Sequence, residues 1–103
     1  MFNAAAEVLI ENSPASLPAR VTELSLRGCF LNVSGSFTEH QCLQIKIFES
    51  EEFFEARAKV LYVRPSGVGL LFTEMNPHFR AVLQKWILAA LDDRIEATTE
   101  VEI

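Results

Sequence analysis

The chain has 103 residues, half of them hydrophobic, and a formal net charge of −5. A chain of this length forms one domain and buries roughly 60–68% of its unfolded surface in a single core. Five acids and one base lie in the last twelve residues, so residues 1–91, with nine acids and eight bases, are nearly neutral. A nearly neutral body lacks the basic face that neutralises phosphates, which argues against DNA or RNA binding.

No stretch of the sequence approaches the ~20 apolar residues that a membrane-spanning helix needs. The N-terminus also lacks the basic segment and long apolar core of a signal peptide. We therefore expect a cytoplasmic protein that does not insert into a membrane. Cys29 and Cys42 lie thirteen residues apart and outside any Cys-x-x-Cys motif, so we expect buried or half-buried thiols and no metal site.

Six segments alternate between apolar and polar residues, which is the period of a half-buried strand. Turn-forming residues separate most of them. The segments span residues 6–11, 17–22, 29–33, 43–47, 54–62 and 68–73. Short strands at this spacing predict an all-β fold, a six-stranded antiparallel barrel that is closed or nearly closed. In the fifth segment, the alternation predicts that Val60 and Tyr62 point inward with Phe54, Ala56 and Ala58.

The hydrophobic period changes from 2 to 3.6 after residue 73. Asn76 can cap a helix and Pro77 suits its first position. The apolar stripe that follows consists of Phe79, Val82, Leu83, Trp86, Ile87 and Ala90. This pattern predicts one amphipathic C-terminal helix on the barrel, with its Trp and Phe closing an open barrel end. We place the domain at residues 1–92 and an acidic, flexible tail at 93–103.

Polar groups converge between two apolar segments at residues 23–28. Glu23 and Ser25 lie two residues apart, so they share one face of an extended backbone, and Gly28 permits a turn or a close approach. From the residues alone, Ser25 is a turn serine, Glu23 a solvated acid and Arg27 a surface residue. Arg20 would share the outer face of Glu23 only after a bulge, and we assign it no role.

The motifs of common enzymes are missing from the sequence. It has no Gly-x-Ser-x-Gly elbow, no His-Glu-x-x-His motif and no P-loop. His40 and His78 have no Ser or Cys at a spacing that suggests a triad. We expect no catalytic residues and no enzyme activity.

The sequence Glu-Leu-Ser-Leu-Arg-Gly at residues 23–28 resembles the second signature of PilZ domains, which are bacterial receptors for the messenger cyclic di-GMP. Glu23 stands where the family usually has Asp or Asn. Residues 2–8 are similar to the family's first strand, 54–60 to its long central strand, and 67–72 to the strand before its closing helix. The resemblance covers residues 2–91 and implies a PilZ-like six-stranded barrel capped by a C-terminal helix.

The resemblance implies a ligand site at Glu23, Ser25, Arg27 and Gly28, with cyclic di-GMP as the candidate ligand and no cofactor. A carboxylate at position 23 would accept the paired N1–H and N2–H₂ donors of a guanine. Ser25 would contact the guanine as well. The planar guanidinium of Arg27 would stack on a purine or pair with a phosphate.

The family's first signature, Arg-x-x-x-Arg, belongs just before the first strand, and the sequence given starts at about the place where that segment ends. The resemblance therefore implies a cyclic di-GMP-responsive signalling domain with weakened nucleotide binding. The alternative is a PilZ-like module that binds a protein partner and no nucleotide. The residues encoded upstream of Met1 would distinguish the two.

Overall fold

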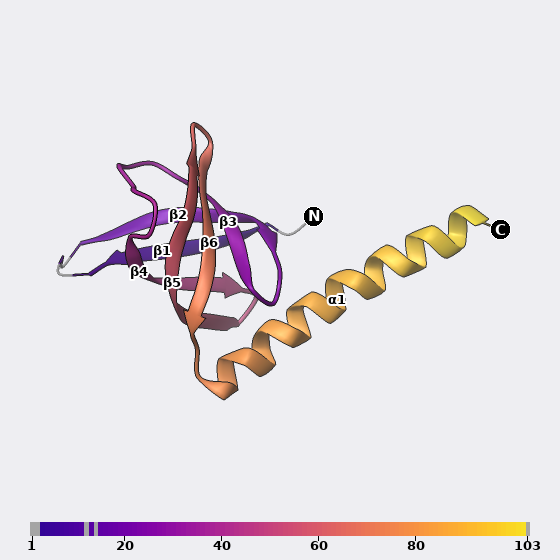
Figure 1. Cartoon of the computed structure of the whole chain (residues 1–103). Helices are drawn as coiled ribbons and strands as arrows, with labels where there is room; N and C mark the ends of the chain where they lie inside the picture. The colour runs from indigo at the N-terminus through magenta and orange to yellow at the C-terminus, as the bar shows by residue number, and fades with distance from the viewer. Residues whose placement is uncertain (1–2, 12, 14, 103) are drawn as a thin grey trace.

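The computed structural model describes residues 3–11, 13 and 15–102, with side chains described as far as Ala90. Within these residues the chain forms six strands and one helix (Figure 1). Their bounds are β1 (Ala4–Ile10), β2 (Ser16–Leu24), β3 (Gly28–Val33), β4 (Cys42–Glu49), β5 (Glu52–Arg64), β6 (Gly67–Glu74) and α1 (Pro77–Glu102).

The strands close into a barrel in the order β1-β2-β3-β6-β5-β4, and every neighbouring pair is antiparallel. Two meanders build it, β1-β2-β3 and β4-β5-β6, in which each strand pairs with the next along the chain. The pairs β1–β4 and β3–β6 then join the meanders. The prediction of a six-stranded antiparallel barrel with a C-terminal helix is confirmed.

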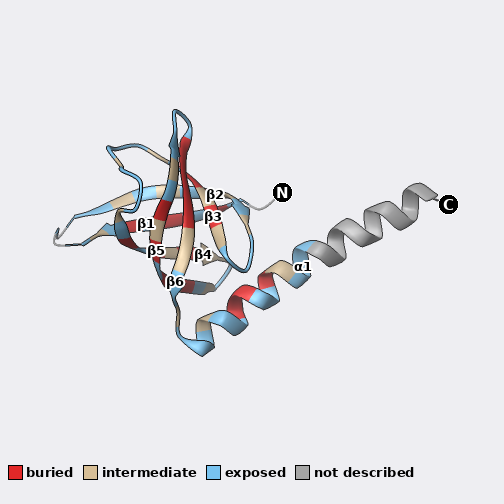
Figure 2. Cartoon of the chain, viewed as in Figure 1, coloured by how far each residue is buried: buried red, intermediate tan, exposed pale blue. Residues whose placement is uncertain are grey.

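The core lies inside the barrel and is made by side chains from all six strands. Figure 2 marks the buried residues along the strands in red. Val8, Val21, Leu31, Phe54 and Val60 are completely buried. Among the described residues, no polar or charged residue is buried. The hydrophobic effect therefore dominates the stability of the interior, and polar groups that could serve chemistry lie outside it.

The first half of α1 covers β5. The side-chain Oδ1 of Asn76 accepts a hydrogen bond of 2.8 Å from the His78 amide, as expected of a cap. Of the expected stripe, Val82, Leu83 and Trp86 are buried, Phe79 and Ile87 are half-buried, and Ala90 is exposed. The side chains of the expected acidic tail at 93–103 lie outside the described ones, so its flexibility stays a prediction. No helix in the described part of the chain is long and apolar enough to span a membrane.

A register shift in β5 changes the direction of Tyr62. Val60 pairs with Leu70 and Tyr62 with Gly69, so Leu61 is an extra residue opposite β6. Such a bulge turns the next side chain to the other face. The prediction that Tyr62 points inward beside Val60 is therefore wrong, and Tyr62 lies half-buried on the outer face.

A second shift lies in β2, between Val21 and Glu23. Arg20 pairs with Asn32 and Glu23 pairs with Phe30, which leaves Thr22 as the extra residue. Arg20 and Glu23 are both exposed. The bulge that these two residues need to share the outer face is present.

The two thiols differ in their surroundings. Cys29 is buried, and burial raises the pKa of its thiol to about 12. Cys42 is exposed, so the expectation of two buried or half-buried thiols is wrong for this residue. It opens β4 directly after the loop, where its side chain points away from the core. The described residues contain no cluster of three His, Cys, Asp or Glu side chains able to hold a metal.

Candidate functional site

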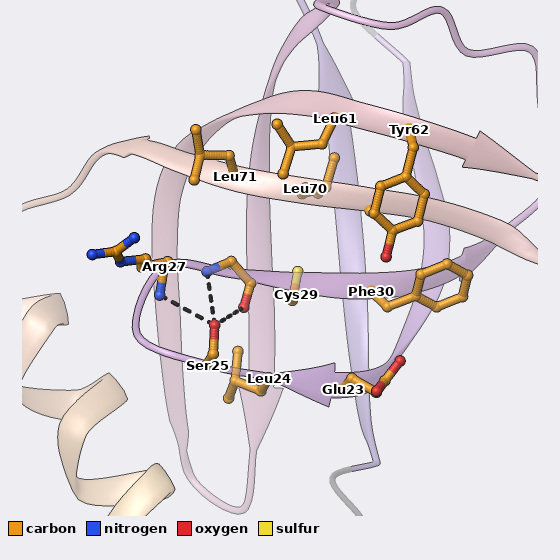
Figure 3. Close-up of a pocket in the computed structure, with 12 residues that line it drawn as sticks. Glu23, Leu24, Ser25, Arg27, Cys29, Phe30, Leu61, Tyr62, Leu70 and Leu71 are labelled. Carbon is orange, nitrogen blue, oxygen red and sulfur yellow. Dashed lines mark hydrogen bonds between the residues drawn. The ribbon is translucent and has the colours of Figure 1, made fainter.

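A pocket of about 360 Å³ opens on the outer face of the barrel, between the β2–β3 turn and strands β5 and β6 (Figure 3). Glu23, Ser25, Arg27 and Gly28 all line it. The four residues that the sequence singled out therefore lie around one cavity.

Ser25 organises the turn at one side of this pocket. Its Oγ accepts hydrogen bonds of 3.2 Å from the amides of Arg27 and Gly28 and donates one of 3.3 Å to the Gly28 carbonyl (Figure 3). The Ser25 amide donates a further bond of 2.9 Å to the same carbonyl. The hydroxyl thus holds the turn rigid, which is the local role expected of serine beside glycine. A ligand in the pocket meets a preformed turn.

Gly28 lets β3 approach β6 closely. A Cβ at this position would overlap the carbonyl oxygen of Leu70. The Arg27 carbonyl next to it accepts a bond of 2.7 Å from the Phe72 amide, which ties the turn to β6. The pocket wall therefore depends on a residue without a side chain.

Arg27 and Glu23 lie at opposite ends of the pocket. Figure 3 shows the guanidinium of Arg27 pointing away from Tyr62, whereas the carboxylate of Glu23 lies beside Phe30. Both side chains are exposed. They cannot grip the same group of a small ligand.

Three residues that the motif analysis missed complete the site. Phe30, Gly69 and Tyr62 follow Glu23 in one row across β2, β3, β6 and β5. The rings of Phe30 and Tyr62 stack with centroids 6.2 Å apart and planes 26° apart. A Cβ on Gly69 would overlap the Tyr62 ring, so the glycine lets the ring lie flat on β6.

This row suits a planar heterocycle. An aromatic surface stacks on a base, with roughly 1–3 kcal/mol per base in nucleic-acid complexes. An acid at the edge of such a surface can accept the donors of a purine. The Phe30–Tyr62 pair and Glu23 supply these two features side by side. No single-sequence pattern announces the pair, because a bulge sets the direction of Tyr62.

A second pocket, of about 510 Å³, lies where β4, β5 and β6 meet the start of α1. Its charged residues are Glu55, Arg57 and Glu74. Arg57 lies 3.3 Å from the carboxylate of Glu11 and 4.0 Å from that of Glu74. Because its one cation is already paired and acids predominate, this pocket is less suited to an anionic ligand.

A family model described as PilZ domain matches residues 2–89. The match takes in all six strands and the first half of α1. A comparison with curated proteins gives no match to this chain.

Proposed function

Since the chain belongs to the PilZ domain family, a family of cyclic di-GMP receptors rather than enzymes, we propose that it is a cyclic di-GMP-responsive signalling domain that binds this nucleotide in the pocket beside the β2–β3 turn. One observation supports the site above the others. Glu23, Ser25, Arg27 and Gly28 line a single cavity that also contains the stacked Phe30–Tyr62 pair.

In this proposal the residues around the pocket have separate roles. A guanine stacks on the Phe30–Tyr62 pair, and its N1–H and N2–H₂ donate to the Glu23 carboxylate. Ser25 keeps the turn in shape through its bonds to the Arg27 and Gly28 amides. Arg27 contributes charge at the far end of the pocket.

We expect the affinity of residues 1–103 to be low. These residues contain no Arg-x-x-x-Arg pattern. Each missing arginine contact forfeits a charge-assisted bond of roughly 1.5–3 kcal/mol. Two such contacts amount to roughly 3–6 kcal/mol, or two to four decades in Kd. A receptor with a Kd of about 1 μM would then bind with a Kd of about 0.1–10 mM.

Calorimetry and NMR titration of residues 1–103 with cyclic di-GMP test the proposal. We expect binding near millimolar or weaker, with amide shift changes centred on Ser25 to Gly28. Glu23→Gln should weaken it further, because one of the two acceptor oxygens is replaced by an NH₂ donor that faces a guanine donor and the negative charge is lost. Glu51→Gln, which removes an exposed acid from the β4–β5 turn, is the matched control.

Two results would contradict the proposal in different ways. Sub-micromolar binding by residues 1–103 would show that the affinity does not need an Arg-x-x-x-Arg segment. Amide shift changes confined to the face of α1 would show that the proposal assigns the ligand to the wrong surface.

Protein binding is the second candidate function, and exposed apolar side chains near the pocket favour it. Leu61, which lines the pocket, and Leu26, in the β2–β3 turn, are 44% and 46% exposed. Exposed apolar residues around a cavity are typical of interaction surfaces. The absence of any shift change at millimolar cyclic di-GMP would favour this second function.

A further inference from the structure

A second row of outward positions crosses the same four strands, next to the row that carries Phe30 and Tyr62. Arg20 on β2 pairs with Asn32 on β3, and Arg64 on β5 pairs with Gly67 on β6. The β3–β6 register, continued by one residue, sets Asn32 opposite Gly67. The row therefore reads arginine, asparagine, glycine, arginine.

The two arginines differ in their contacts, and only Arg64 contacts the aromatic pair. Arg64 lies with its guanidinium carbon 4.7 Å from the centre of the Tyr62 ring. Arg20 donates a hydrogen bond of 2.6 Å from Nη1 to the Oδ1 of Asn3. The bulge between Val21 and Glu23 sets Arg20 on the same outer face as Glu23, and both arginines lie beside the pocket rather than among its lining residues.

Neither arginine is used in an ion pair. Three other cations are: Lys46 lies 3.5 Å from Glu55, Arg57 3.3 Å from Glu11 and Lys85 2.9 Å from Glu52. Among the described residues, Arg27, Lys59 and Arg80 are likewise outside any ion pair. Within the described residues, no acid lies within 4.0 Å of the guanidinium of Arg20 or Arg64. In a chain of net charge −5, two uncompensated arginines on one face are available for an external anion.

We propose, resting on the proposed function, that Arg20 and Arg64 bind the two phosphates of a cyclic purine dinucleotide, one at each side of the Phe30–Tyr62 surface. Three strand spacings of about 4.8 Å separate their backbones by about 14 Å. Gly67 between them lets β6 approach β3 closely, because a Cβ there would overlap the carbonyl oxygen of Leu31. Arginine's planar fork pairs with phosphate oxygens in two parallel bonds, which fixes the orientation of the ligand.

The test is an NMR titration of residues 1–103 with cyclic di-GMP to several millimolar, for the wild type, Arg20→Gln and Arg64→Gln. Arg57→Gln is the matched control, since it removes the same charge from β5 at the other pocket. We expect Arg20→Gln and Arg64→Gln each to weaken binding about 10-fold or more, since each removes a charge-assisted bond. Arg57→Gln should change the affinity less than about twofold, because its rim charge is far from the ligand.

Two readouts separate this inference from the proposed function. Wild-type shift changes should include the amides of Asn32 and Gly67 as well as Ser25 to Gly28. Guanosine, which lacks phosphate, should bind the wild type and both arginine variants equally. Each variant is also checked for an unchanged thermal midpoint, as expected for an exposed position.

Binding that is unaffected by Arg20→Gln and Arg64→Gln, with changes only at Ser25 to Gly28, would overturn the inference and leave the proposed function standing. A loss of guanosine binding equal to the loss of cyclic di-GMP binding would also overturn it, because the arginines would then act on the base. If cyclic di-GMP causes no shift change in the wild type at these concentrations, both proposals fail.

Discussion

Aromatic residues have opposite roles in two regions of the molecule. One is the helix-covered region, where the first half of α1 packs on β5, and the other is the pocket face, the outer surface of β2, β3, β6 and β5 around the pocket. Phe54 is completely buried, with the rings of Phe72 and Trp86 at 5.1 and 6.5 Å, so these aromatics fill space. Phe30 and Tyr62 stack on each other while only half-buried, above a glycine. The backbone makes the difference. Regular alternation turns Phe54 into the core and Phe30 to the outside, whereas a bulge turns Tyr62 to the outside and Gly69 leaves room for its ring.

Trp86→Asp should disrupt the packing of α1 on the barrel and cause the largest loss of stability among these predictions. It replaces a buried indole, 6% exposed, by a charge, so we expect several kcal/mol from the free energy of unfolding. Chemical denaturation measures this. Leu88→Asp, on the same helix at a side chain that is 59% exposed, is the control and should change stability by less than about 0.5 kcal/mol. An unchanged midpoint for Trp86→Asp would refute the docked helix.

Two glycine substitutions in the pocket face should distinguish an effect on the stability of the fold from an effect on ligand binding. Gly28→Ala sets a methyl group against the Leu70 backbone, which cannot move aside, so we expect a loss of about 1–3 kcal/mol. Gly69→Ala meets only the Tyr62 ring, which can swing away, so stability should fall less while cyclic di-GMP affinity falls. Thermal unfolding and NMR titration check the pair. The reverse order of stabilities would contradict this account of the two contacts.

The smallest expected effect concerns pH at the edge of the helix-covered region. The Lys85 ammonium, 2.9 Å from the Glu52 carboxylate, holds the pKa of that carboxyl below its usual 4.5, and the Trp86 indole adds to this. Because the pKa of Glu52 is lower in the folded than in the unfolded state, the ionised carboxylate stabilises the folded state above pH 4.5. This stabilisation is lost as the pH falls through the pKa of the folded state. Between pH 5 and 3, the wild type should lose slightly more stability than Glu52→Gln in denaturation curves. An equal loss in both would show that the pair contributes nothing.

Alternation and helical period were enough to predict the barrel and the helix, because burial imposes them directly. Val82, Leu83 and Trp86 are buried as the stripe predicted. Tyr62 was placed on the wrong face because a bulge depends on the partner strand, and strand pairing is invisible in one sequence. The same limitation hid Arg20, whose direction depends on the bulge at Thr22.

The candidate site was half predictable. A short motif indicated Glu23, Ser25, Arg27 and Gly28, and all four line the pocket. Phe30 joins them as the pairing partner of Glu23, and Tyr62 joins them only through the β3–β6 and β5–β6 registers, which link residues far apart in the chain. A motif contains only residues that are close in sequence, so it could not predict the pocket residues on β5 and β6.

The strand order of the barrel has a consequence for folding. Each meander contains only local hairpins, which form quickly, whereas β1–β4 and β3–β6 pair residues about 40 positions apart. The pocket lies across the second of these seams, with Glu23 and Phe30 on one meander and Tyr62 and Gly69 on the other. A ligand held by both sides binds the closed barrel and neither meander alone. Ligand binding is therefore thermodynamically coupled to the pairing of β3 with β6. A ligand bound there stabilises the closed barrel against separation of the two meanders.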